Sequence, residues 1–279
     1  MPDPDAPLRL IDHWPVATAA AAVSRSGSIV AEHGPVGHVF RLASLSKPIA
    51  AWAMLVAVEE GTIDLDEPIA GSSLRHLLAH AGGYGFDGSS TITAPGRRRI
   101  YSNTGIDKAA DEVAERSGMP FGEYLREAVF EPLAMSSSTL RGSPAHAVHS
   151  TVSDVSRFLA ETTTPRLVSP ATARAATSVQ FPGLAGIVPG VGSFADNTWG
   201  LGFEIRDDKR PHWTGTRNSP ATFGHFGGSG TMMWVDPMVD LALVALTDRD
   251  FDEWSADALR LWPELSDAVV TAFGSESTP

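Results

Sequence analysis

A long apolar helix near the N-terminus constrains the fold of this 279-residue chain more than any other feature. The segment 44–60, SLSKPIAAWAMLVAVEE, is apolar on nearly all sides and is followed by Gly61, a residue that favours helix C-termini. Pro48 falls in the first turn, where its missing N–H costs little. A helix that is apolar all round must be covered on every side. The sequence therefore predicts a core helix enclosed by other elements.

Segments with strand patterns lie at both ends of the chain, and segments with helix patterns lie between them. A hairpin is predicted over 16–32 with its turn at Ser26-Gly27, and 37–42 adds an extended piece. The later strands and the closing helix are predicted at 199–206, 221–226, 230–235, 241–246 and 254–273. The helices in the middle are predicted at 74–80, 106–118, 121–131 and 154–161. The stretch 181–197 is rich in Gly and Pro and is interpreted as a surface loop.

This order of elements predicts an α+β fold whose sheet takes strands from both ends of the chain. The sequence has no repeat of the length that solenoids use, and its length suits one large unit or two interlocked subdomains. We expect a single domain over 1–279. Within it, a sheet subdomain would comprise 1–61 and 175–279, and a helical subdomain would comprise 62–174.

The composition argues against several classes of function. A net charge of -12 would repel the phosphates of nucleic acids and anionic membrane surfaces. No run of residues approaches the length of a membrane span, and Asp3 and Asp5 stand where a signal peptide needs positive charge. The chain has no cysteine and therefore no thiolate chemistry. We expect a cytoplasmic protein that acts on a small molecule, with its oligomeric state left open.

A serine and a lysine stand three positions apart at the start of the apolar helix, in the tetrad SLSK. Residues i and i+3 share a helix face, so the Ser44 hydroxyl and the Lys47 amine can meet. A serine hydroxyl needs an adjacent base to become a nucleophile, and burial lowers the pKa of a lysine towards that of a base. The chain has lysine only at 47, 108 and 209. A lysine in an apolar helix is costly to bury, so its presence here favours a functional role. The alternative is a capping serine beside an exposed lysine.

Tyr101-Ser102-Asn103 supplies a second group of polar side chains. A phenol beside an ammonium group has its ionised form favoured, so Tyr101 is expected to share proton transfer with Lys47. Asn103 is expected to donate a hydrogen bond to a substrate carbonyl or to Lys47. The alternative is a tyrosine packed on the turn that Gly96 opens.

The segment FGHFGGSGTMMWVDP, which contains His225, carries glycines at the edge of a predicted strand. Glycines there let a ligand approach the backbone closely. A backbone N–H in this segment, together with that of Ser44, would form an oxyanion hole. The alternative is a glycine-rich hairpin without chemical meaning.

Taken in order, the three motifs resemble those of the class C β-lactamases and of the related D-alanyl-D-alanine carboxypeptidases, esterases and D-aminopeptidases. FRLASLSKPIAAWAMLVAVEEGTIDLDEPI is similar to the family's nucleophile helix, and LRHLLAHAGGY is similar to its Leu-Leu-x-His-x-Ser-Gly segment. RRIYSNTGIDKAADEVAERSG and FGHFGGSGTMMWVDPMVDLALVALTDR are similar to its tyrosine region and closing strands. The resemblance covers roughly residues 20 to 275.

The resemblance implies an antiparallel sheet flanked by helices, with a helical subdomain and an active-site cleft between the two. It makes Ser44 the nucleophile and Lys47 with Tyr101 the acid/base pair. The substrate-binding positions that it implies are Asn103, His225, Gly227 and Gly228. Asn103 would contact a substrate amide, His225 would occupy the lysine position of the family's Lys-Thr-Gly motif, and the N–H groups of Ser44 and Gly228 would form the oxyanion hole.

The departures from the family pattern bear on the substrate. His225 replaces the usual lysine, and Gly228 offers no hydroxyl to a substrate carboxylate. We therefore expect a serine hydrolase that forms a Ser44 acyl-enzyme with a small ester or amide. One alternative is a β-lactamase or a D-alanyl-D-alanine carboxypeptidase with penicillin-binding activity. The other is a non-catalytic binding member of the fold.

Two further sets of side chains have both a functional and a structural interpretation. His76 and His80 stand four residues apart, as metal-binding pairs on helices do, but no third ligand accompanies them. We predict no metal and no cofactor. Trp199 and Trp213 fall near the strands expected around the cleft, where either would line an acyl pocket or pack in the core.

Overall fold

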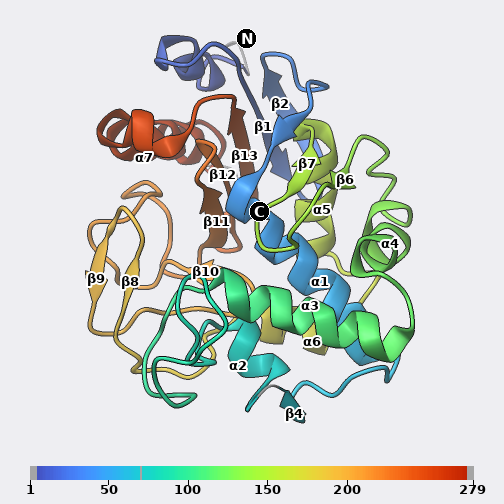
Figure 1. Cartoon of the computed structure of the whole chain (residues 1–279). Coiled ribbons are helices and arrows are strands. Elements are labelled where there is room, and N and C mark those ends of the chain that lie inside the picture. The colour runs from blue at the N-terminus through green and yellow to red at the C-terminus, as the bar shows by residue number, and fades with distance from the viewer. Residues whose placement is uncertain (1–4, 70, 275–279) are drawn as a thin grey trace.

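A six-stranded antiparallel sheet combines strands from the two ends of the chain (Figure 1). The computed structural model describes residues 5–69 and 71–274. The spatial order is β10-β11-β12-β13-β1-β2, so the first hairpin pairs with the last strand, and Ala20 lies opposite Leu246. The strands are β1 (Ala19–Arg25), β2 (Ser28–His33), β10 (Glu204–Ile205), β11 (Phe223–Gly227), β12 (Thr231–Asp236) and β13 (Leu241–Thr247). This arrangement confirms the predicted α+β fold with an antiparallel sheet flanked by helices.

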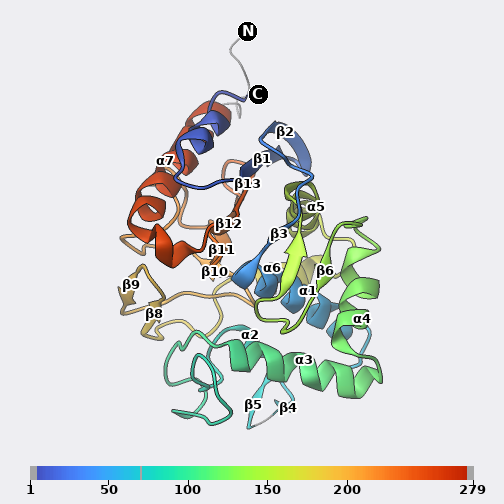
Figure 2. The same ribbon diagram turned by 45° about the horizontal axis from the view of Figure 1, so that its top comes forward.

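The sheet is covered on both faces, because successive side chains of a strand point to opposite sides. Leu243 and Ala245 of β13 pack with α7 (Ser255–Phe273) and with η1, a 3₁₀ helix at Leu8–His13. The intervening Val244 and Leu246 belong to the other core, which contains α1 (Ser46–Glu59) and α5 (Val152–Thr163). Figure 2 shows α7 on one side of the sheet and α1 with α5 on the other.

Helix α1 lies at the centre of the larger core, as its sequence predicts. Every residue from Ile49 to Leu55 is 0% exposed. Trp52 makes edge-on ring contacts with Phe158 of α5 and with Phe203. The remaining helices and turns are η2 (Ala43–Leu45), α2 (Leu74–Leu78), α3 (Asn103–Ser117), α4 (Phe121–Leu125), the π-helical η3 (Arg126–Phe130), α6 (Pro170–Ala176) and η4 (Phe251–Glu253).

Short strands complete the fold. They are β3 (Phe40–Arg41), β4 (Pro68–Ile69), β5 (Ser72–Ser73), β6 (Thr139–Leu140), β7 (Val148–Ser150), β8 (Gly186–Val188) and β9 (Gly192–Phe194). Strand β3 pairs with β7, which ties the segment before α1 to the middle of the chain. In the parts of the chain that the structure describes, no helix has the length and apolarity needed to cross a membrane.

Two predicted elements differ from the structure. The stretch 181–197 is a loop only in part, because β8 and β9 form a hairpin within it. The predicted strand at 199–206 is a strand only at Glu204–Ile205. The chain turns before that point, since Gly202 has a φ of +86° and its N–H donates to the carbonyl of Leu78.

Candidate active site

Ser44 is the middle residue of the 3₁₀ turn η2, and this turn leads directly into α1. The preceding residue, Ala43, has a φ of +47°, which is uncommon for a residue with a side chain. The turn brings the Ser44 Oγ within 3.2 Å of the Lys47 Nζ, which donates a hydrogen bond to it. The serine and the lysine of the tetrad therefore meet, as the i and i+3 spacing predicts.

The Lys47 ammonium is fully buried and has three hydrogen-bond acceptors. Besides Ser44 Oγ, its Nζ donates to Asn103 Oδ1 at 2.7 Å and to the carbonyl oxygen of Ala145 at 3.0 Å. Burial lowers the pKa of Lys47 to about 7, although the negative charges of Asp107 and Asp87 act to raise that pKa. A lysine with this pKa exchanges its proton near neutral pH. The expectation that Asn103 donates to Lys47 is wrong, because the amide oxygen of Asn103 accepts.

The Tyr101 ring is enclosed by other rings. His80 lies 4.7 Å from it between ring centroids, Trp199 and His225 lie at 5.7 Å, and Phe86 lies at 5.9 Å. This burial raises the pKa of the phenol well above its usual range, although a hydrogen bond with the serine opposes the shift. The expectation that the ionised form is favoured is therefore wrong. The Lys47 Nζ lies 4.5 Å from the ring centroid, over the face of the ring.

His225 presents a neutral imidazole to the same space. Its Nδ1 lies 2.6 Å from the carbonyl oxygen of Phe226, so Nδ1 carries the proton and Nε2 is free to accept. The Tyr101 hydroxyl lies 3.5 Å from Nε2, at the long end of a hydrogen bond. Burial and the charge of Lys47 lower the pKa of His225 to about 3. His225 therefore does not supply the positive charge that a lysine would supply at this position.

The two glycines at the end of β11 differ in their surroundings. A Cβ on Gly227 would lie 2.4 Å from the carbonyl oxygen of Leu42 and 3.2 Å from the Ser44 N, so only glycine lets the Ser44 turn approach the strand. The sequence predicts that a ligand approaches the backbone at these glycines. At Gly227 it is the backbone of residues 42–44 that does so. Gly228 is exposed, and a Cβ there would meet nothing within 4 Å. The strand end consequently lies beside the Ser44 N–H, as an oxyanion hole requires.

A cavity of about 220 Å³ opens over these groups, with Ser44, Tyr101, His225 and Gly228 in its lining. Aromatic side chains dominate its walls, and the segment Val188–Gly190 of the β8–β9 hairpin closes one side. The aromatic wall residues are Phe86, Trp199, Phe226 and Phe251. Trp199 therefore lines the pocket, which is the first of the two roles considered for it from the sequence. The charged residues in the lining are acidic, namely Glu204 and Asp252.

A family model described as Beta-lactamase matches residues 10–264 of the chain. The chain belongs to the β-lactamase family. A crystal structure described as a β-lactamase from Mycobacterium bovis is 49% identical, with a TM-score of 0.93, and the match covers 96% of this chain and 99% of that one. The simvastatin synthase of Aspergillus terreus shares the fold at 14% identity and a TM-score of 0.77, with 97% of each chain covered.

Among curated proteins, this β-lactamase family member resembles penicillin-binding protein 4* of Bacillus subtilis (strain 168). The two are 26% identical in an alignment of 132 residues, and the match covers 35% of this chain and 29% of that protein. The match thus spans less than a third of the length of the curated relative.

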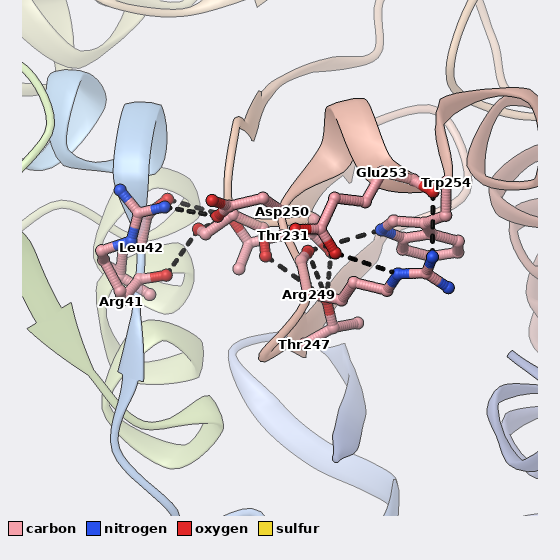
Figure 3. Close-up of polar contacts among 10 residues, drawn as sticks. Arg41, Leu42, Thr231, Thr247, Arg249, Asp250, Glu253 and Trp254 are labelled. Atoms are coloured by element: carbon pink, nitrogen blue, oxygen red, sulfur yellow. Dashed lines mark hydrogen bonds and ion pairs between the residues drawn. The ribbon is translucent and has the colours of Figure 1, made fainter. Parts of the chain in front are cut away.

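In this β-lactamase family member, the segment before Ser44 is fastened to the end of the sheet (Figure 3). The Thr231 hydroxyl donates to the carbonyl oxygen of Leu42 at 2.9 Å, and the Ser229 hydroxyl donates to that of Arg41 at 2.6 Å. The Arg41 guanidinium also forms an ion pair with Asp250. The network continues through Thr247, Arg249, Glu253 and Trp254. These contacts fix the backbone that carries the Ser44 N–H.

Replacing Thr231 with valine should loosen this attachment without changing the size of the side chain. Thr231 is 0% exposed, and loss of its hydrogen bond should lower the free energy of unfolding by about 1–2 kcal/mol. Displacement of the Ser44 turn should also lower the rate at which a serine-directed reagent labels Ser44 by about tenfold. Thr222→Val is the matched control, because the buried Thr222 hydroxyl has no partner among the described residues. Equal effects of the two substitutions would contradict the assignment.

A buried ion pair between Glu204 and Lys209 lies behind the wall of the pocket. Glu204 accepts hydrogen bonds from Lys209 Nζ at 2.8 Å and from Trp213 Nε1 at 2.7 Å, and His212 Nε2 lies 3.3 Å away. Burial alone would raise the pKa of Glu204, but Lys209 and His212 outweigh it and hold that pKa well below its usual range. Trp213 therefore packs behind the pocket, in the core. Neither the ion pair nor the hairpin wall is visible in a local sequence pattern.

The histidine pair considered as a metal site is held by other partners. His76 Nδ1 lies 2.8 Å from the Ser73 hydroxyl, and its ring stacks on Phe181. His80 Nδ1 accepts from the Ser102 N–H at 3.2 Å, beside Tyr101. Within residues 5–69 and 71–274, no group of three or more side chains suits a metal ion.

Proposed function

We propose that this protein is a serine hydrolase that acylates itself at Ser44 and acts on small, neutral esters or amides. The observation that carries the proposal is the contact between Ser44 Oγ and the buried Lys47 Nζ at 3.2 Å. Because the pKa of Lys47 is about 7, a substantial share of the enzyme holds the free amine at neutral pH. The free amine is the base that a serine nucleophile needs.

The acceptors around Lys47 determine where its lone pair points. Asn103 Oδ1 and the carbonyl oxygen of Ala145 can only accept hydrogen bonds. When Lys47 loses a proton, its two remaining N–H groups stay with these two oxygens. The lone pair then faces Ser44 Oγ, which can give up its proton in that direction. This geometry favours Lys47 as the base for acylation.

The remaining steps follow from the neighbours of Ser44. Ser44 Oγ attacks the substrate carbonyl carbon as its proton passes to Lys47, and the N–H groups of Ser44 and Gly228 stabilise the oxyanion. The proton returns through Lys47 and the neutral Tyr101 hydroxyl to the leaving group as the ester or amide bond breaks. Water then attacks the acyl carbon as it gives a proton to Tyr101 and Lys47, the bond between that carbon and Ser44 Oγ breaks, Oγ takes the proton back, and the carboxylic acid leaves.

The charge of the pocket supports a neutral acyl group as the substrate. The lining contains Glu204 and Asp252, while His225 is neutral and Gly228 has no hydroxyl. Because Lys209 balances the charge of Glu204, a carboxylate on the substrate would meet the negative charge of Asp252 and no cationic side chain in the lining. The aromatic walls instead suit an apolar acyl chain.

A second candidate function is β-lactam hydrolysis. It is favoured by the structure from Mycobacterium bovis, which is described as a β-lactamase and is 49% identical over nearly the whole chain. The partial match to a penicillin-binding protein points the same way. Stable binding of penicillin, or turnover of nitrocefin faster than of any ester, would support this function. A protein that is inert towards every acyl substrate would instead be a binding member of the fold.

Two measurements test the proposal. A fluorophosphonate should add one adduct to the peptide that contains Ser44, as read by mass spectrometry, and none to the Ser44→Ala protein. The p-nitrophenyl esters of butyrate and of succinate, the second with a free carboxylate, form a matched pair of substrates. We expect kcat/KM to be about tenfold or more higher for the butyrate, since a like-charge contact costs more than about 1.4 kcal/mol. No adduct at Ser44, or a preference for the anionic ester, would contradict the proposal.

A further inference from the structure

We propose that Asp87 and Asp107 are positioning residues that hold the two carbonyl acceptors of Lys47 and, through their charge, set the pH range in which Lys47 serves as a base. The inference rests on the proposed function. It concerns two side chains that do not touch Lys47 and to which the sequence analysis gives no role. Each carboxylate is connected to Lys47 by its own chain of hydrogen bonds through uncharged groups.

The first connection runs through Asn103. The Asn103 Nδ2 donates to Asp87 Oδ1 at 3.1 Å, and the Asn103 Oδ1 accepts from Lys47 at 2.7 Å. A carboxylate can only accept, so Asp87 fixes which end of the amide is the NH₂ group. The oxygen of Asn103 must then face Lys47. Without Asp87 the amide could turn over and present N–H groups to the ammonium.

The second connection runs through the loop that precedes β7. The Ser143 hydroxyl donates to Asp107 Oδ1 at 2.6 Å and accepts from the Ala145 N–H at 3.1 Å. The carbonyl oxygen of Ala145 accepts from Lys47 at 3.0 Å. Asp107, which lies on α3, thereby holds the loop that supplies the third acceptor of the ammonium.

The charged and titratable groups around Lys47 come from several elements. Tyr101 is neutral, and His80 and His225 have pKa values that burial and the charge of Lys47 hold below the usual range. The negative charges that oppose the desolvation of Lys47 are those of Asp107 and then Asp87. Asp107 is half-buried and Asp87 is exposed, so water screens the second charge more.

The experiment replaces each carboxylate by its neutral amide, which keeps an oxygen that can accept. Asp107→Asn and Asp87→Asn are compared with Asp111→Asn, an exposed aspartate one turn further along α3. Because the chain has three lysines, lysine labelled with ¹³C and ¹⁵N gives three side-chain signals. The Lys47 signal is the one that disappears in Lys47→Met. Its titration is followed by NMR in each full-length variant, together with the pH dependence of kcat/KM for p-nitrophenyl butyrate and a thermal unfolding curve.

We expect the titration midpoint of Lys47, near pH 7 in the wild type, to fall by roughly half to one unit in Asp107→Asn. The fall should be smaller in Asp87→Asn and absent in Asp111→Asn. The acid limb of the kcat/KM profile should move with the midpoint, because the free amine would persist to lower pH. An unchanged midpoint in both variants would overturn the inference, as would a loss of activity that is equal at every pH. The NMR titration needs no turnover, so failure of the proposed function, seen as no adduct on Ser44, is distinguished from failure of this inference.

Discussion

Replacing Lys47 with methionine should lower kcat/KM for p-nitrophenyl butyrate by about three to four orders of magnitude, since a positioned general base contributes up to ~10⁴-fold. Methionine fills a similar volume and packs well in an apolar core. It removes the amine that lies 3.2 Å from Ser44 Oγ. Without that base the serine keeps its proton and remains a poor nucleophile. Steady-state hydrolysis and the rate of fluorophosphonate labelling should fall together, because both need the activated Ser44.

Two further variants separate the amine from the charge. Lys47→Arg keeps a positive charge but cannot lose its proton in the neutral range, so it should be about as inactive as the methionine variant. Lys108→Met removes a lysine that lies on α3 over the Tyr84 ring, and should leave kcat/KM near the wild-type value. An active arginine variant would show that a fixed charge suffices and that Lys47 is not the base.

Replacing Glu204 with alanine should lower the free energy of unfolding at pH 7 by about 3–5 kcal/mol, since it leaves a buried charge without its partner. Lys209 is 4% exposed, and once its bond to Glu204 is lost its ammonium would still donate to the carbonyl oxygen of Thr198 but would have no carboxylate beside it. The Trp213 Nε1, which donates to Glu204 at 2.7 Å, would also lose its acceptor. Urea unfolding followed by tryptophan fluorescence measures the loss. Glu264→Ala removes the partner of Arg260 in an exposed pair and should have little effect.

The same pair predicts how stability depends on pH. The pKa of Glu204 is lower in the folded protein than in the unfolded chain. Its contribution is therefore fully present above the unfolded-state pKa of about 4.3 and declines as the pH falls below that value. The difference in unfolding free energy between the wild type and Glu204→Gln should shrink between pH 5 and pH 3. A difference that stays constant over this range would mean that the carboxylate is not ionised against Lys209.

Several features were predictable from the sequence because they depend on local periodicity and spacing. The apolar segment 44–60 forms the buried helix α1, preceded by one 3₁₀ turn. The i and i+3 spacing brings the side chains of Ser44 and Lys47 together. The strand that carries His225 and Gly227 lies within the sheet formed by both ends of the chain. Helix α6 was not predicted, although Ser169 caps it and Pro170 opens it, because seven residues give too short a periodic pattern.

Other features depended on contacts between distant parts of the chain. The partners of Lys47 lie 56 and 98 residues further along the chain, in Asn103 and Ala145. The sequence predicted that Tyr101 would tend to ionise, but the rings packed around it raise its pKa. The hairpin within 181–197 looked like a loop, yet its residues Val188–Gly190 close the pocket.

The family, the core helix and the pairing of a serine with a lysine follow from residue types at fixed short spacings along the chain. The protonation states and the shape of the pocket depend instead on how distant elements pack together. Burial removes water from Lys47, Tyr101 and His225, and the free energy of a charge depends on that removal. The extent of burial follows from packing between elements that the sequence places far apart.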